Sequence, residues 1–203
     1  MVESLSLLGH MFRFGASGRR DRPAAKGAEI IEAVAAGDPD ALRELYRTYS
    51  SELFVFIVRR LGDRQLAEET LQDVMLAAWR GARSFRADAS VRTWLYAIAH
   101  RRVLTAMRKL PEQRVAFELE FLESDATGPE DWVEFRRRAT VVHGAVSELP
   151  QHQRLVVELI YLHGLTGPEV ARVLGVAIGT VKSRHNRALN ALKPLLEELS
   201  DAS

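Results

Sequence analysis

Residues 164–192, GLTGPEVARVLGVAIGTVKSRHNRALNAL, predict two short helices joined by a tight turn. Thr166 and Glu169 have the spacing of a capping box, in which a hydroxyl and a carboxylate satisfy the free N–H groups at the start of a helix. Gly175 can adopt the left-handed conformation that ends a helix sharply. A second helix begins near Ile178, so the stretch predicts a helix-turn-helix motif.

The second helix has an apolar side and a polar side when its residues are placed about 100° apart. The apolar side is formed by Val181, Ala188, Leu189 and Leu192. The opposite side carries Ser183, Asn186, Arg187 and Asn190, with Lys182 and Arg184 along its two edges. Amide and guanidinium groups suit the edges of bases and the flanking cations suit phosphates, which is typical of a DNA-reading helix. The alternative is an ordinary amphipathic hairpin with a solvated basic face.

The composition limits the chemistry open to the chain. It has 203 residues, a net charge of +1 and no cysteine, which excludes disulfides, zinc–cysteine sites and thiol catalysis. A chain without cysteine is compatible with a reducing cytoplasm, where we expect the protein to act. No uninterrupted apolar run approaches the roughly 18 residues of a membrane span, so we expect no membrane insertion.

No group of residues indicates catalysis or a cofactor. The 6 histidines are scattered along the chain. Glu158 and His163 are too far apart for good ligand spacing on an α-helix. No stretch resembles a glycine-rich phosphate loop, or a nucleophile with a base. We therefore expect no enzymatic activity, no cofactor and no metal.

Helical patterns account for almost the whole chain, which predicts an all-α fold of two small domains joined by an acidic linker. Residues 1–28, with Gly, Ser, Pro and several Arg towards their end, predict a disordered tail. Residues 29–109 predict an N-terminal helical domain, residues 110–134 the acidic linker, and residues 135–198 a C-terminal helix-turn-helix domain.

The N-terminal domain contains a helix with a distinct polar stripe. An earlier helix is expected to begin at Asp38-Pro39, where an N-cap precedes a proline, and to stop at Gly62. The next helix runs from about Arg64 to Ala82. Its polar stripe consists of Glu69, Gln72 and Asp73. Such a stripe is usually a solvated face, but an acidic stripe with a glutamine can also dock a basic partner helix.

A loop, SFRADASVR at residues 84–92, connects the stripe-bearing helix to a basic one. The basic helix is predicted from Thr93 to about Lys109. The charges in and beside it are Arg92, Arg101, Arg102, Arg108 and Lys109, with no acid among them. A basic helix that carries Trp94 fits nucleic acid, since aromatic rings can stack on exposed bases. The alternative is that Trp94 belongs to the core, as we expect for its neighbours Leu95 and Ile98.

The chain resembles the extracytoplasmic-function (ECF) group of bacterial sigma factors in the order of three segments. These are AEETLQDVMLAAWRGARSF, TWLYAIAHRRVLTAMRK and, after the linker, ELPQHQRLVVELIYLHGLTGPEVARVLGVAIGTVKSRHNRAL. The resemblance extends from Asp38 to about Leu196. It implies that the protein binds core RNA polymerase, recognises the −10 and −35 boxes of promoter DNA and helps to melt the duplex.

The resemblance also implies a role for each candidate site residue. Glu69, Gln72 and Asp73 would face the polymerase clamp. The loop formed by Phe85, Arg86, Ala87, Asp88, Ala89 and Ser90 would hold a flipped base of the −10 box, and Trp94, Arg101 and Arg102 would meet the melting duplex. The −35 box would be bound by Lys182, Ser183, Arg184, Asn186, Arg187 and Asn190.

One residue departs from the group. His185 stands where these proteins usually have an apolar side chain, which predicts looser packing of the second helix of the motif; we interpret it as a core histidine rather than a ligand. An anti-sigma factor is implied as a further partner, because the group commonly has one. Two other functions stay open: a conventional helix-turn-helix regulator acting through its C-terminal domain, and an adaptor that binds partners without reading DNA.

Overall fold

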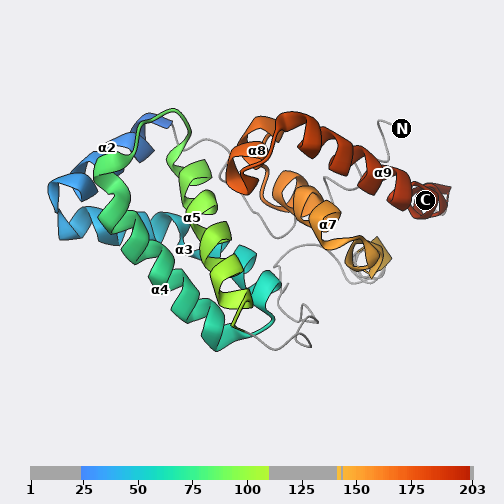
Figure 1. Ribbon diagram of the computed structural model, residues 1–203, viewed down its shortest axis with the longest axis horizontal. Coiled ribbons are helices and arrows are strands. Elements are labelled where there is room, and N and C mark those ends of the chain that lie inside the picture. Colours follow the sequence, from blue (N-terminus) through green and yellow to red (C-terminus); the bar gives the residue numbers. More distant parts are fainter. Residues whose placement is uncertain (1–23, 110–140, 143, 202–203) are drawn as a thin grey trace, which may run out of the picture. The chain divides into compact units, whose positions relative to one another are not determined.

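The computed structural model describes residues 24–109, 141–142 and 144–201, and every regular element within those ranges is a helix (Figure 1). The predicted all-α class is therefore confirmed. The chain divides into two compact units, one containing the helices before the linker and the other containing α7 (Gln151–Val157) and α9 (Ile178–Asp201). The acidic linker predicted at 110–134 and most of the predicted tail lie outside the described residues.

The N-terminal unit is a bundle built around three long helices, α3, α4 and α5. Its elements are α2 (Ala24–Ala36), α3 (Pro39–Leu61), α4 (Arg64–Gly81), the short 3-10 helix η1 (Ala82–Ser84) and α5 (Val91–Met107). Each of the three long helices packs against the other two, as Figure 1 shows. Phe56 of α3 meets the fully buried Tyr96 of α5 edge to face, with ring centroids 5.4 Å apart. Burial raises the pKa of the Tyr96 phenol.

Side-chain caps begin α3 and α4, and the cap of α3 is the one that the sequence predicts. Asp38 accepts a hydrogen bond from the backbone N–H of Asp40 at 2.8 Å, and proline occupies the start of α3. Gly62 ends the helix in the left-handed conformation, with φ of 64°. Asp63 then caps α4 by accepting from the N–H of Leu66 at 3.0 Å. One short connection therefore both stops α3 and starts α4.

The N-terminal unit begins earlier than predicted, so the tail assigned to residues 1–28 is wrong in its last part. Helix α2 begins at Ala24, and Ile30, Ile31 and Val34 are almost fully buried on one of its sides. Gly27 is buried as well, where an added Cβ atom would lie 3.3 Å from the hydroxyl of Tyr49. The glycine lets the helix approach the bundle closely, whereas in the sequence it suggested a flexible tail.

The C-terminal unit packs its last long helix against the helices that precede the turn. Residues 141–142 and 144–148 are helical, and α7 is followed by a π-helical segment η2 (Glu158–Leu162), α8 (Gly167–Leu174) and α9. The core cluster consists of Val142, Val146, Leu149, Val157, Ala188 and Leu192. Helix α7 and α9 are in extensive contact, which fixes which side of α9 is buried.

The π-helical segment changes the relation between Glu158 and His163. The N–H of His163 donates to the carbonyl of Glu158 at 3.0 Å, the five-residue hydrogen bond of a π-helix, and both side chains are buried. Residues five apart are one turn apart in a π-helix, so the reason why this spacing is poor on an α-helix does not apply to Glu158 and His163. Among the described residues, no group of three or more His, Cys, Asp or Glu side chains could hold a metal ion.

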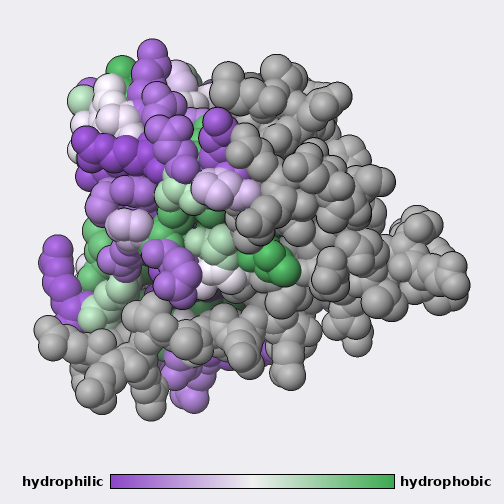
Figure 2. Space-filling view, turned by 90° about the vertical axis from the view of Figure 1, so that its right-hand side faces the viewer, coloured by the Kyte–Doolittle hydropathy of each residue, from purple (hydrophilic) through white to green (hydrophobic). Residues whose placement is uncertain are grey.

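No helix in the described ranges is long and apolar enough to cross a membrane. The face drawn in Figure 2 shows hydrophilic residues over much of its described part, with hydrophobic residues gathered beside them. Most of the large aliphatic side chains are instead in the cores of the two units.

We expect a buried histidine on α5 to make the N-terminal unit sensitive to acid. His100 on α5 is 8% exposed, and burial, with Arg60 and Arg101 nearby, lowers its pKa from 6.5 to about 4. Above pH 6.5 the imidazole is neutral in the folded and unfolded states, so its full contribution is present. As the pH falls below 6.5 the unfolded chain takes up a proton that the folded protein does not. We expect the free energy of unfolding to drop by about 1 kcal/mol between pH 7 and about pH 5.5 from this group.

Urea unfolding of the wild-type protein at the two pH values would measure this loss. In His100→Leu the contribution should vanish and the pH dependence should flatten. His152→Leu is the control, since His152 lies exposed at the start of α7. An unchanged pH dependence in His100→Leu would show that His100 is not the group responsible.

Candidate nucleic-acid and partner-binding surfaces

Hydrogen bonds define both ends of α8, and those at its C-terminal end form the tight turn into α9. The N–H of Thr166 donates to the carboxylate of Glu169 at 2.8 Å, so the carboxylate half of the predicted capping box is present, while the Thr166 hydroxyl donates to the same carboxylate at 2.7 Å. At the other end Gly175 has φ of 66°, its N–H donates to Arg172 and the N–H of Val176 donates to Ala171. This pair of bonds is a Schellman motif, which turns the chain sharply into α9.

The two sides of α9 differ in exposure as predicted. Val181, Ala188 and Leu192 are at most 2% exposed. The exposed set consists of Lys182, Ser183, Asn186, Arg187 and Asn190. Arg184 is only half-buried, at the border of the apolar side. We call the exposed set, without Lys182, the polar face of α9.

Ser183 is partly committed within its own helix. Its hydroxyl donates to the carbonyl of Thr180 at 3.0 Å. While that bond is kept, Ser183 offers only acceptor lone pairs to a ligand. Asn186, Arg187 and Asn190 therefore carry the main donors of the polar face.

His185 is anchored more specifically than the sequence suggests. Its ring stacks on that of Tyr161 from the π-helical segment, with centroids 5.8 Å apart and planes 22° apart. Its Nε2 and the Tyr161 hydroxyl are hydrogen-bonded at 3.1 Å. Burial lowers the pKa of His185 and raises that of Tyr161. The expectation of looser packing at this position is wrong, because Tyr161 supplies both an apolar surface and a polar partner.

The polar stripe of Glu69, Gln72 and Asp73 lies exposed on α4. The buried side of the same helix includes Leu71 and Val74, so the stripe points away from the bundle. Leu76, at 46% exposure, continues the stripe by one further turn. A sequence pattern of polar residues alone does not include this apolar side chain, although its spacing from Gln72 and Asp73 would have indicated it.

The loop at residues 85–90 is shorter than predicted, because α5 begins at Val91 and not at Thr93. Ser90 is its N-cap: the hydroxyl accepts from the N–H of Thr93 at 3.1 Å. The S-x-x-T spacing was the signal for this cap. Phe85 packs against the ring of Trp94 with centroids 5.3 Å apart. Arg86, Ala87 and Asp88 are therefore the exposed tip of the loop.

Ala87 has a left-handed backbone, with φ of 54°. This conformation is unfavourable for a residue with a Cβ atom, and a glycine there would relieve it. Residues held in such conformations often lie where a protein contacts its ligands. The strain therefore marks the loop tip as a candidate contact.

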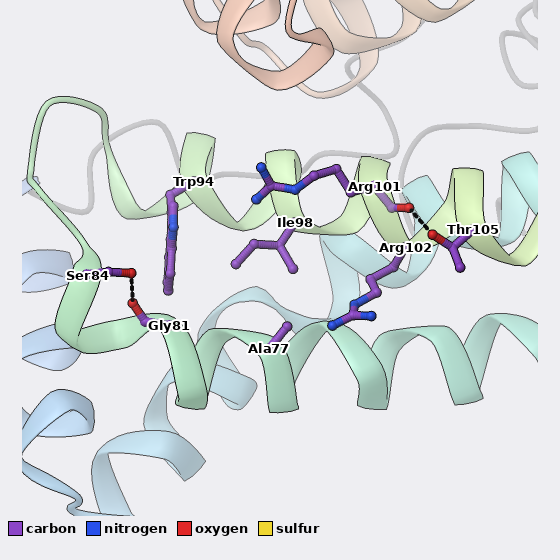
Figure 3. Close-up of a pocket in the computed structure, with 8 residues that line it drawn as sticks. All are labelled: Ala77, Gly81, Ser84, Trp94, Ile98, Arg101, Arg102 and Thr105. Atoms are coloured by element: carbon purple, nitrogen blue, oxygen red, sulfur yellow. Dashed lines mark hydrogen bonds between the residues drawn. The ribbon is translucent and has the colours of Figure 1, made fainter.

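A groove of about 380 Å³ lies between α4 and α5, beside this loop. Its lining residues are Ala77, Gly81, Ser84, Trp94, Ile98, Arg101, Arg102 and Thr105 (Figure 3). Trp94 points towards Gly81, where an added Cβ atom would lie 3.5 Å from the indole ring. Trp94 is half-buried while Leu95 is fully buried. The two interpretations offered for this part of α5, core packing and nucleic-acid contact, thus apply to different residues. Leu95 belongs to the core, and Trp94 is open to the groove.

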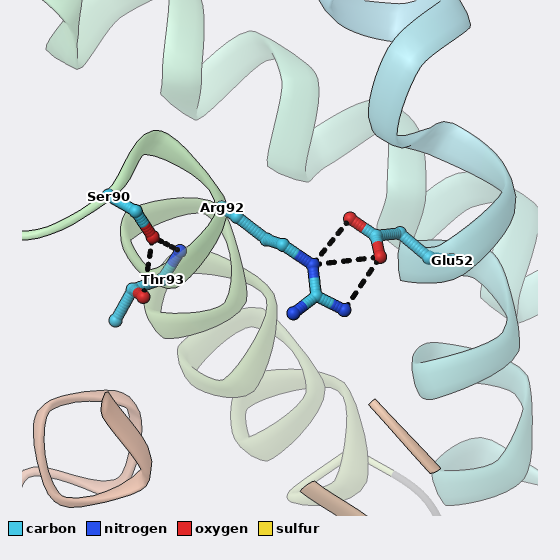
Figure 4. Close-up of polar contacts among 4 residues, drawn as sticks. All are labelled: Glu52, Ser90, Arg92 and Thr93. Atoms are coloured by element: carbon cyan, nitrogen blue, oxygen red, sulfur yellow. Dashed lines mark hydrogen bonds and ion pairs between the residues drawn. The ribbon is translucent and has the colours of Figure 1, made fainter. Parts of the chain in front are cut away.

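Arg92 belongs to the bundle and not to the groove. Its guanidinium donates to both carboxylate oxygens of Glu52 on α3, the closest at 2.8 Å (Figure 4). The same group lies 5.2 Å from the centroid of the Tyr96 ring. Three hydrogen bonds between the planar guanidinium and carboxylate groups hold α5 against α3. The cations left exposed near the groove are Arg101 and Arg102.

Two family models match the two units separately. The model for Sigma-70 region 2 matches residues 45–112, which include α4, the loop and α5. The model for Sigma-70, region 4, matches residues 140–192, which include the helix-turn-helix. Over 194 residues, 95% of this chain, the sequence is 34% identical to the ECF RNA polymerase sigma factor SigM of Mycobacterium tuberculosis, of which 94% is covered.

The chain belongs to the ECF group of RNA polymerase sigma factors. A second relative of this sigma factor is the RNA polymerase sigma-H factor of Pseudomonas aeruginosa, 32% identical over 84% of this chain and 95% of the relative. Sigma factors are not enzymes in themselves; they direct RNA polymerase to promoters, and this sigma factor acts in promoter-directed initiation of transcription.

Solved structures agree with the fold of the sigma factor. CnrH, in complex with the cytosolic domain of CnrY, superposes with a TM-score of 0.58 at 25% identity, covering 85% of this chain and 97% of that one. The sigma factor RpoE of Bartonella quintana, in complex with the anti-sigma factor NepR, gives a TM-score of 0.56 at 24% identity, covering 76% and 96%.

Proposed function

We propose that this sigma factor divides promoter recognition between its two units. Helix α9 binds the −35 box, whereas the loop at 85–90 and the α4–α5 groove bind the −10 box. The polar stripe on α4 binds core polymerase. The observation that carries this proposal is the polar face of α9. It exposes amides and a guanidinium on the side opposite a core that is at most 2% exposed.

The −35 assignment rests on the chemistry of that face. Arg187 can pair with the O6 and N7 acceptors of guanine, and Asn186 with the N6 and N7 atoms of adenine, in the major groove. Lys182 and Arg184, along the edges, suit the phosphates on either side. Because α9 is held by α7 and by the Tyr161–His185 pair, these groups are presented in one orientation.

The −10 assignment rests on the groove and the loop beside it. The groove combines an indole ring, on which an unpaired base can stack, with two exposed guanidinium groups that can neutralise phosphates. Figure 3 shows the Arg102 guanidinium pointing towards α4 across the groove. The exposed loop tip, Arg86, Ala87 and Asp88, offers both charged side chains and a strained backbone for a flipped base.

The partners follow from these surfaces. The acidic stripe, with Leu76 in line, suits a basic partner surface such as one on the polymerase clamp. The protein itself needs no cofactor for this role, carries out no catalysis and acts in the cytoplasm. An anti-sigma factor is a further partner, supported by the complex of RpoE with NepR.

A transcription assay tests the proposed function. Core polymerase supplemented with this protein should initiate at defined promoters selected from a random DNA library, and core polymerase alone should not. A conventional regulator would instead require another sigma factor in the reaction. If transcripts appear only when a second sigma factor is added, the sigma-factor role is wrong for this chain.

A further inference from the structure

The first turn of α9 contains an aliphatic side chain outside the core. Ile178, the first residue of the helix, is 41% exposed, whereas Val181 and Leu192 are at most 2% exposed. One side of Ile178 lies against Gly167 of α8: a Cβ atom added to Gly167 would be 3.4 Å from the Cδ1 atom of Ile178. The rest of the side chain is open. A large apolar group is thus positioned, but not buried, at the tip of the helix.

The helical row that runs through three residues of the polar face begins, one turn earlier, with a residue that has no side chain. Gly179, Ser183, Asn186 and Asn190 follow the i, i+4, i+7, i+11 spacing of one helical face. Gly179 is exposed, and an added Cβ atom there would have no neighbour within 4 Å. The glycine is therefore not required by packing within the described residues, nor by its backbone, which is helical.

We propose that the Ile178–Gly179 turn is the part of α9 that enters the −35 major groove most deeply, with Ile178 contacting the 5-methyl group of a thymine and Gly179 allowing the helix to approach the bases. This inference rests on the proposed −35 role of α9. The N-terminal residues of a recognition helix are the ones that reach base edges. Thymine alone presents a methyl group in the major groove, and apolar side chains are its usual partners.

Lys182 supports this placement. It follows Ile178 by one helical turn on the same flank and is exposed. A cation at the edge and an aliphatic group at the tip fit a helix whose N-terminal end enters the groove while its flank runs along the phosphates. Hence Ile178 specifies a base, whereas Lys182 contributes affinity that does not depend on sequence.

Replacing thymine by deoxyuridine removes only the methyl group and tests the contact directly. Holoenzyme formed with the full-length protein is measured on a promoter fragment selected from a randomised −35 library. With wild-type protein, one −35 thymine should lose about fourfold in affinity on replacement, the effect of one buried methyl group. With Ile178→Ala the same replacement should change affinity less than twofold.

Gly179→Ala tests the close approach with two opposite readouts. Alanine in a helix is more stable than glycine, and no neighbour opposes it here, so the melting temperature should rise by about 2–5 °C. Affinity for the −35 box should nevertheless fall about tenfold, because the added methyl group meets the bases. Gly144→Ala is the matched control: Gly144 is also helical, exposed and without neighbours within 4 Å of an added Cβ atom. It should leave affinity for the −35 box unchanged.

The outcomes separate this inference from the function on which it rests. If wild-type holoenzyme shows no −35 preference, the proposed role of α9 fails. If the preference is clear but no thymine replacement distinguishes wild type from Ile178→Ala, only the methyl contact is wrong. If Gly179→Ala binds the −35 box as tightly as Gly144→Ala does, the helix does not approach the bases at this turn.

Discussion

Replacing Glu69, Gln72 and Asp73 together by alanine is expected to weaken binding of this sigma factor to core polymerase by at least about 30-fold, since truncating interface hot spots typically costs ~2 kcal/mol or more. The three side chains are exposed on one side of α4, while the opposite side is in the core. Alanine favours helix at all three positions, so the fold should be retained. Fluorescence anisotropy of labelled protein titrated with core polymerase would measure the loss.

A matched control removes the same amount of charge elsewhere in the same unit. Glu29 and Glu32 are exposed on α2, and their double replacement by alanine removes two carboxylates, as the triple variant does. We expect the control to bind core polymerase within about twofold of wild type, because exposed charges away from an interface contribute little. Equal affinities of the triple variant and wild type would mean that the stripe is only a solvated face.

The second large effect is expected on α9, where two arginines should fail in different ways. Arg187 lies exposed on the polar face, and Arg187→Ala should reduce base discrimination at one −35 position by roughly 5- to 150-fold, from ~1–3 kcal/mol for a good bidentate pair. Arg184 is half-buried at the edge. Arg184→Ala should weaken binding to all sequences alike and reduce the salt dependence by about one phosphate contact.

Holoenzyme selection on a randomised −35 library at two salt concentrations would measure both effects. Asn186→Ala should behave like Arg187→Ala at a different base position, since both side chains lie on the polar face. The reverse pattern, with Arg184→Ala altering base preference and Arg187→Ala only lowering affinity, would place the DNA on another side of α9.

Local signals in the sequence were sufficient for the ends of several helices and for the faces of the two functional helices. Asp38-Pro39, Gly62 and the Thr166–Glu169 box act within a few residues of the chain, so the helix ends they predict are present. The period of apolar residues identified the buried side of α9, because a helix must turn that side to its core. The family is likewise evident from the order of the segments.

Features that depend on residues distant in the chain required the tertiary structure. Gly27 and its helix α2 looked like a tail, because only Tyr49 and Val91 show why a glycine is needed there. Arg92 looked like a free cation until Glu52, from another helix, accounted for it. His185 looked poorly suited to packing until Tyr161 was found stacked on it. Each of these residues takes its role from a partner brought close by folding, and the chemical identity of a side chain does not specify that partner.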